Sequence, residues 1–200
     1  MTGGNGRRSN RERSEETRRR LIQAARKAFA EKGYAATGTP ELVAATGLSR
    51  GALYHQFPDK AALFRAVLED AQQDVVAAID TAAAAAPDAL TALRRGSRAF
   101  VAACMRPGIR RIVLIDGPAV LGWQVWREVD AAHALGTLIA GLDALAQAGR
   151  LRPGLTVQAT ALLLSGALNE AALAASEGRL GDAEIATAID ALLDGISRPA

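Results

Sequence analysis

The stretch that most constrains the fold is residues 37–60, TGTPELVAATGLSRGALYHQFPDK, which predicts two short helices joined by a tight turn. Thr39 is a good N-cap for the first helix, and Gly47, which tolerates positive φ, is a good residue to end it. Ser49 can cap the second helix, and Pro58 stops that helix. A longer helix predicted over residues 14–32 would brace this pair.

The second short helix has two unlike sides. Leu53 and Phe57 are four residues apart and share the side that we expect to be buried. The other side and its flanks carry small and hydrogen-bonding residues, which are Arg50, Gly51, Ala52, Tyr54 and His55. A short helix presented by a turn of small residues has the shape that enters the major groove of DNA, where arginine pairs with guanine. An ordinary helical hairpin inside a bundle fits the same spacing, so the pattern alone leaves both interpretations open.

Further residues in unbroken order between positions 17 and 68 match one known pattern. They are Ala24, Ala25, Phe29, Glu31-Lys32-Gly33-Tyr34, Thr37, Gly47-Leu48-Ser49-Arg50-Gly51-Ala52-Leu53-Tyr54-His55, Phe57-Pro58 and Lys60. This region resembles the DNA-binding domain of the tetracycline-repressor (TetR/AcrR) family of bacterial transcriptional regulators. The chain departs from the family pattern at Gly38, where Ser or Thr is frequent, and at Pro40, which cannot make the charged contact of the basic residue common there.

The resemblance implies which residues touch double-stranded DNA. The implied positions are Thr37, Thr39, Ser49, Arg50, Gly51, Ala52, Tyr54, His55 and Lys60. Arg50 and its neighbours would read bases, whereas Tyr54 and Lys60 would grip the phosphate backbone.

The composition favours an all-α fold. Half of the residues are hydrophobic and only 4% are aromatic, alanine and leucine dominate, and no alternating strand pattern occurs. Beyond the first domain, helices are predicted at 60–85, 87–105, 119–148 with a kink near Gly136, 155–176 and 182–196, with breaks at 107–108 and 116–118. The expected architecture has about nine helices: an N-terminal three-helix helix-turn-helix domain at 14–60 and a C-terminal helical bundle at 61–200.

Charge is divided unevenly along the chain. Residues 1–60 carry a net charge of +6 and residues 61–200 a net charge of −3. The positive field therefore lies on the half with the two-helix motif, where binding to a polyanion would need it. Residues 1–13, which are rich in Gly, Asn, Ser and Arg, are predicted to be a disordered basic arm. Such an arm could follow DNA or form only a solvated tail.

The helices at 155–176 and 182–196 predict a partner chain. The first is apolar around most of its circumference, so we expect it to be buried on more than one side. With a two-fold copy, the two helices would form a four-helix interface, the usual dimer arrangement in the resembled family. A homodimer through about 155–196 would present two recognition helices to a pseudo-palindromic DNA site. The alternative is that these helices only complete the core of a monomer.

The resemblance also implies a pocket in the second half for a small-molecule effector, expected to be partly apolar. The candidate lining residues are Phe100, Met105, Trp123, Trp126, His133 and Asn169. Each has a simpler explanation, because Trp123 and Trp126 share a helix face as core aromatics would, and Asn169 could face solvent. The expected function is that of a ligand-responsive repressor, released from its operator by the effector.

Other chemistries have little support in the sequence. His133 has no second His or Cys at ligand spacing, so we expect neither a metal site nor a cofactor. No nucleophile–base set or phosphate loop occurs, which argues against an enzyme. A single cysteine, no signal peptide and no long apolar run predict a cytoplasmic protein without a membrane partner. A protein that binds DNA without sequence preference is the remaining alternative.

Overall fold

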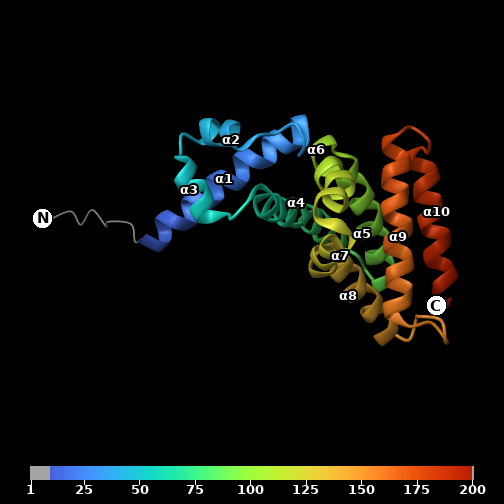
Figure 1. The fold of residues 1–200 in the computed structure, drawn as a ribbon. Helices are drawn as coiled ribbons and strands as arrows, with labels where there is room; N and C mark the ends of the chain where they lie inside the picture. The colour runs from blue at the N-terminus through green and yellow to red at the C-terminus, as the bar shows by residue number, and fades with distance from the viewer. Residues whose placement is uncertain (1–9, 200) are drawn as a thin grey trace, which may run out of the picture.

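The computed structural model describes residues 10–199, and the predicted all-α fold is confirmed (Figure 1). Its elements are α1 (Asn10–Lys32), α2 (Thr39–Thr46), α3 (Arg50–Gln56), α4 (Lys60–Ala83), α5 (Ala89–Met105), α6 (Pro107–Arg110), the π-helical segment η1 (Arg111–Asp116), α7 (Gly117–Ala132), α8 (Ala134–Gln147), α9 (Val157–Ser176) and α10 (Asp182–Ile196). Because α6, η1 and α7 follow one another directly, they count as one helical run, which is kinked at Gly122 (φ 78°, ψ 159°), and the described part of the chain has nine helical segments.

Helices α1 to α3 form an N-terminal domain around one small core. Leu21 and Phe29 of α1, Leu42 of α2 and Leu53 of α3 are all fully buried. Phe29 also packs edge-on against Phe64 of α4, with ring centroids 5.4 Å apart. Figure 1 shows this domain on one side of the molecule and α5 to α10 on the other.

Helix α4 joins the two domains. It begins after Asp59, whose side chain accepts a hydrogen bond of 2.7 Å from the backbone N–H of Ala62. Arg26 of α1 is ion-paired with both Asp70 and Asp74 of α4. Further along, α4 packs against α5, α7 and α8. A displacement of the C-terminal bundle would therefore shift α4 and, with it, the position of the N-terminal domain.

Helix α5 is central to the C-terminal bundle, where it packs against α4, α8, α9 and α10. Its larger apolar residues Leu90, Leu93 and Phe100 are buried. Arg94 and Arg98 on its outer side pair with Asp190 of α10. Helices α9 and α10 lie at the outer side of the molecule (Figure 1). They therefore form the face most available to a second chain.

Two predicted N-termini are wrong. Helix α1 begins at Asn10, so residues 10–13 are helical rather than part of a disordered arm, and an ion pair between Arg11 and Glu15 supports this first turn. Residues 1–9 of the predicted arm lie outside the described residues. In α2 the N-cap is Gly38 instead of Thr39. Pro40 tolerates this shift because the first N–H groups of a helix have no partner within it.

The predicted break at 116–118 is absent. The chain continues from η1 into α7 through Gly117 and Pro118, because proline in a first turn removes no helical hydrogen bond. The predicted kink near Gly136 is displaced to His133, which has φ −128° and ψ −104°. The helical run from α6 to α7 meets α8 there at a bend of 49°. Glycine permits a kink but does not impose one, and Gly136 stays helical.

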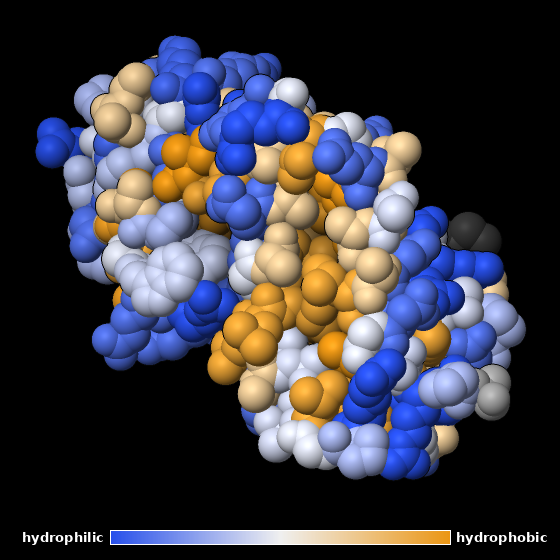
Figure 2. All heavy atoms as spheres, turned by 90° about the vertical axis from the view of Figure 1, so that its right-hand side faces the viewer, coloured by the Kyte–Doolittle hydropathy of each residue, from blue (hydrophilic) through white to orange (hydrophobic). Residues whose placement is uncertain are grey.

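The outer face of α9 is uncovered in the single chain. Leu162 and Leu163 of α9 are 51% and 76% exposed, and Leu192 of α10 is 49% exposed. Figure 2 faces the α9–α10 side and shows apolar surface along the middle with polar residues on the flanks. Among the described residues, α9 alone is a single helix long and apolar enough to cross a membrane, a property that core helices of soluble proteins share. Burial on several sides would require a partner.

Candidate nucleic-acid interface and internal cavity

A tight turn sets the position of helix α3. Gly47 adopts φ 64° at the end of α2, where its backbone N–H bonds to the carbonyl of Ala44. Ser49 then caps α3, and its Oγ accepts a hydrogen bond of 3.1 Å from the N–H of Ala52. Leu53 anchors the inner side of α3 in the core. This arrangement turns the opposite side of α3 toward solvent.

That outer side has the residues expected of a DNA-reading surface. Ser49, Arg50, Gly51, Tyr54 and His55 are exposed, and Ala52 is half-buried. The guanidinium carbon of Arg50 lies 5.5 Å from the centroid of the Tyr54 ring. Hydrogen bonds from Thr39 and then Arg50 lower the pKa of the Tyr54 phenol. We call these six residues, Ser49 to Ala52 with Tyr54 and His55, the recognition surface.

Thr37 and Lys60, two other predicted contact residues, are engaged inside the protein. Thr37 is only 1% exposed, and its hydroxyl donates a hydrogen bond of 2.8 Å to the carbonyl of Gly33. Lys60 is half-buried and donates from Nζ to the carbonyls of Tyr34 and Thr37, each at 2.9 Å. An ammonium has three donors, so one remains for a phosphate. The hydroxyl of Thr37 does not face solvent in this conformation.

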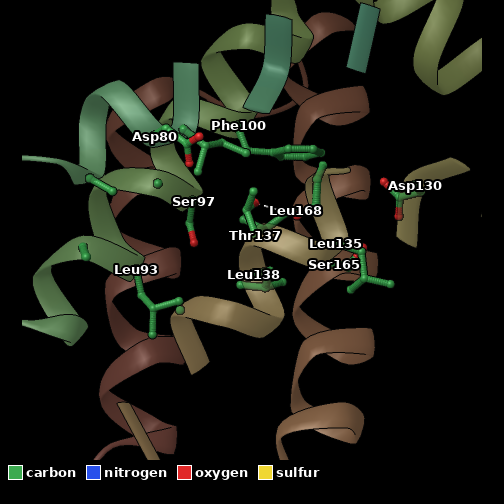
Figure 3. Close-up of a pocket in the computed structure, with 16 residues that line it drawn as sticks. Asp80, Leu93, Ser97, Phe100, Asp130, Leu135, Thr137, Leu138, Ser165 and Leu168 are labelled. Atoms are coloured by element: carbon green, nitrogen blue, oxygen red, sulfur yellow. Dashed lines mark hydrogen bonds between the residues drawn. The ribbon is translucent and has the colours of Figure 1, made fainter. Parts of the chain in front are cut away.

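The C-terminal bundle contains a cavity of about 220 Å³, partly open to solvent, between α4, α5, α7, α8 and α9 (Figure 3). Most of its wall is apolar, and the larger contributors are Leu93, Phe100, Leu135, Leu138 and Leu168. Gly141 of the wall lets Leu93 pack closely against α8, because a Cβ there would lie 2.7 Å from Cδ2 of Leu93. A largely apolar cavity with a few polar groups is the usual form of a small-molecule site.

Of the six predicted lining residues, only Phe100 lines this cavity. Met105 and His133 line two other, more open grooves, and Asn169 is half-buried elsewhere on α9. Trp126 is buried and donates from Nε1 to the carbonyl of Val113 at 2.7 Å, whereas Trp123 is 62% exposed. The two indoles stack with centroids 4.9 Å apart, as their shared helix face predicted.

A buried polar group at the cavity was missed by the sequence analysis. Asp130 of α7 lines the cavity and is 2% exposed, and burial raises the pKa of its carboxyl. Its Oδ1 accepts a hydrogen bond of 3.3 Å from Gln72, which is itself fully buried. The available signal was a lone carboxylate next to Val129 on an apolar helix face. A charged side chain on a buried apolar face is rare unless it is paired or binds a ligand.

The π-helical segment η1 is hydrogen-bonded to the end of α1. Arg111 donates from Nη1 to the carbonyls of Ala30 and Glu31, at 3.2 and 2.7 Å. Asp116 accepts a hydrogen bond of 2.9 Å from the backbone N–H of Tyr34. These contacts satisfy polar groups that the end of a helix leaves open. They connect the bundle directly to the domain that carries the recognition surface.

No cluster that could hold a metal is present between residues 10 and 199, where no three His, Cys, Asp or Glu side chains come together. Cys104 is free and buried, and burial raises the pKa of its thiol to about 12. Such a thiol is a poor nucleophile, since the thiolate is the reactive form. Within residues 10–199, the recognition surface and the cavity remain as two candidate sites.

A helix-turn-helix domain joined to a helical bundle with an internal cavity defines a class, the one-component DNA-binding regulators. The family profile described as "Bacterial regulatory proteins, tetR family" matches residues 21–67, and that described as "Tetracyclin repressor-like, C-terminal domain" matches residues 90–196. This chain belongs to the TetR family, and it is a transcriptional regulator with a DNA-binding helix-turn-helix domain, not an enzyme.

Individual relatives agree with this assignment. The crystal structure of a TetR-family transcriptional regulator from Pectobacterium atrosepticum has a TM-score of 0.77 and 35% identity, covering 96% of this chain and 100% of that chain. The repressor AcnR of Corynebacterium efficiens is 43% identical over 54 residues, 27% of this chain and 29% of AcnR. The activator FasR of Mycolicibacterium smegmatis is 36% identical over 98 residues, 49% of this chain and 44% of FasR. The matches thus span less than half the length of these two curated relatives.

Proposed function

We propose that this protein is a repressor that binds a pseudo-palindromic operator as a homodimer and is released by a small-molecule effector. The observation that carries the proposal is the exposure of Arg50 and Gly51 at the N-terminal end of α3. Arginine can donate two hydrogen bonds to guanine, and a glycine beside it lets the helix backbone approach the groove. Net charge of +6 on residues 1–60 adds attraction to phosphates.

The dimer is supported by the uncovered apolar face of α9 and α10. Leu163 leaves most of its surface in solvent, which costs free energy that a second copy would recover. Two-fold pairing of α9 and α10 gives a four-helix interface, and each recognition surface then faces one half-site. A dimer interface on this face also accounts for the apolar character of α9 without a membrane. We propose a cytoplasmic location.

Release by an effector is supported by the path from the cavity to α1. Asp130 of the cavity wall is one helical turn from Trp126, whose indole bonds to Val113 within η1. Arg111 and Asp116 of η1 in turn bond to the end of α1. A ligand that favours one arrangement of these contacts lowers DNA affinity by the coupling free energy, commonly about 1–3 kcal/mol.

Two other functions are open to test. An activator is a candidate because FasR, one of the matching relatives, is named as an activator. A protein that binds DNA without sequence preference is a weaker candidate, since phosphate attraction alone does not need an exposed Arg50 beside a glycine.

The test is selection of duplexes from a random pool at fixed salt, followed by affinity measurements on the selected and the scrambled sequence. We expect an inverted repeat bound by two chains, at least about 10³-fold more tightly than scrambled DNA. Equal affinity for both duplexes, or one chain per duplex, would refute the proposal. Transcription from a promoter carrying the selected site then distinguishes repression from activation.

A further inference from the structure

The cavity is lined by acids and by no bases. Among the residues that line it, Asp130 and Asp80 carry carboxylates, and none is Lys, Arg or His. Figure 3 shows these two acids on opposite sides of Phe100. Asp80 is exposed, whereas Asp130 is buried. A carboxylate or phosphate ligand would therefore enter an apolar space between two negative groups, without a cation on the wall to balance it.

Asp130 has hydrogen-bonding capacity that the protein leaves unused. Its Oδ2 is buried without a hydrogen-bond partner, and so is Oε1 of the neighbouring Gln72. Arg127 is ion-paired with Asp130, but its Nη1 lies 3.8 Å from Asp130 Oδ2, too far for a hydrogen bond, and that Nη1 is also without one. Arg127 instead lies over the rings of Trp123 and Trp126 and does not line the cavity.

The hydroxyl group of Thr137 on the cavity wall adds another acceptor. It donates its proton to the carbonyl of Ala134 at 2.8 Å, which leaves the oxygen lone pairs for a ligand. Buried acceptors without donors cost free energy, and a ligand N–H group would remove that cost at Asp130.

We propose that the effector is an apolar molecule with a protonated amine, which donates a hydrogen bond to Asp130 while its hydrocarbon body fills the space between Phe100 and Leu138. The inference rests on the proposed effector role of this cavity and names the chemical class of the ligand. A protonated amine and a carboxylate form a charge-assisted hydrogen bond, which is stronger than any bond that the neutral lining residues could supply. Asp80 at the exposed side adds attraction for the same charge.

Three probes that differ only in their polar group test the proposal: 1-naphthylmethylamine, 1-naphthylmethanol and 1-naphthoic acid. Binding to the full-length protein is measured by isothermal titration at pH 7. We expect the amine to bind at least about tenfold more tightly than the alcohol, as a hydrogen bond to a charged group provides, and the acid to bind most weakly. Equal affinity for the amine and the alcohol, tighter binding of the acid, or no binding of any probe would each overturn the proposal.

Two variants test whether Asp130 is the residue that makes the protein prefer the amine over the alcohol. Asp130→Asn keeps the shape of the side chain and removes its charge, so the amine should lose its advantage over the alcohol while the alcohol affinity changes little. Asp143→Asn makes the same chemical change at an exposed position of α8 outside the cavity and should keep the full preference. An unchanged preference in Asp130→Asn would place the amine elsewhere and refute the assignment.

The same samples are tested for binding to the selected operator without any probe. Loss of specific DNA binding counts against the proposed function, whereas the order of probe affinities is read independently of DNA. The two failures can therefore be told apart.

Discussion

The backbone N–H of Tyr34, just beyond the end of α1, donates a hydrogen bond to Oδ2 of Asp116 in the other domain. The two residues are 82 positions apart in sequence, and the bond is partly buried. The bond fixes the position of the loop that connects α1 to α2. The geometry of the recognition surface is thus fixed partly by a side chain of the C-terminal bundle.

Asp116→Ala should loosen this junction. The amide of Tyr34 would lose its acceptor, and an unsatisfied, partly buried donor costs about 1–3 kcal/mol. Hydrogen exchange followed by NMR should show faster exchange at Tyr34, with the amides of the α9–α10 face unchanged. Asp116→Asn retains an acceptor oxygen and should exchange like the wild type; equal acceleration in both variants would contradict this role of the bond.

Arg50→Ala should relax sequence specificity. Loss of one bidentate base contact is expected to cost about 1–3 kcal/mol on the selected operator and much less on scrambled DNA. Fluorescence anisotropy with operators changed at each base pair would identify the position that Arg50 reads. Arg198→Ala removes the same charge from an exposed site at the other end of the chain and should leave both affinities nearly unchanged. Equal losses on every duplex would assign Arg50 to the phosphate backbone.

Lys60→Met should reduce both folding stability and DNA affinity. It removes the two donors held by the carbonyls of Tyr34 and Thr37, and charged hydrogen bonds contribute about 1.5–3 kcal/mol each at most. Urea denaturation should show a lower free energy of unfolding, and all DNA sequences should be bound more weakly to the same degree. Lys27→Met, at an exposed position of α1, serves as the control and should retain wild-type stability.

Leu163→Asp should produce monomers. The substitution places a charge where the proposed interface is most apolar, and a desolvated, unpaired carboxylate opposes association. Sedimentation velocity should show one chain per particle, and affinity for the full inverted repeat should fall toward that for a half-site. Ile115→Asp makes the same kind of change at an exposed position of η1 and should remain dimeric. A monomeric wild type would contradict the premise.

Asp130 should make stability depend on pH. Because burial raises the pKa of its carboxyl in the folded state, the folded protein holds this proton more tightly than the unfolded chain. The favourable contribution is present below the ordinary aspartate pKa, near pH 4, and is lost as the pH rises through the folded value. The free energy of unfolding of Asp130→Asn minus that of the wild type should therefore grow from pH 4 to pH 7. A difference that is constant with pH would show that the carboxyl is not perturbed.

The N-terminal domain could be predicted well because its signals are local. Gly47, Ser49 and Leu53 each act on the backbone or core within a few residues, so the turn and the exposed side of α3 follow from the sequence. Thr37 and Lys60 could not be placed in the same way. Lys60 bonds to carbonyls of the loop between α1 and α2, which only the tertiary fold brings within its reach, whereas Thr37 bonds within that loop to the carbonyl of Gly33.

The cavity could not be predicted residue by residue because it lies where five helices meet. Leu93 and Leu138 have no pattern that distinguishes a cavity wall from a filled core, since both are apolar positions on inward helix faces, Leu93 buried and Leu138 half-buried. The aromatic residues were predicted to line the cavity, yet Trp126 packs instead against Gly117. A Cβ on Gly117 would lie 2.7 Å from Cδ1 of Trp126. Only the isolated carboxylate of Asp130 carried a usable signal.

The brevity of α3 has a consequence for how an operator is found in a chromosome. With seven residues the helix makes two turns, and only a few of its side chains can reach base edges. A sequence of only a few base pairs occurs by chance on the order of thousands of times among the 10⁶ or more competing sites of a genome. Two such short sequences at one fixed separation and relative orientation occur by chance far less often. In the proposed homodimer, most of the sequence specificity would therefore come from the distance between the two copies of α3, a quantity that no residue of α3 encodes.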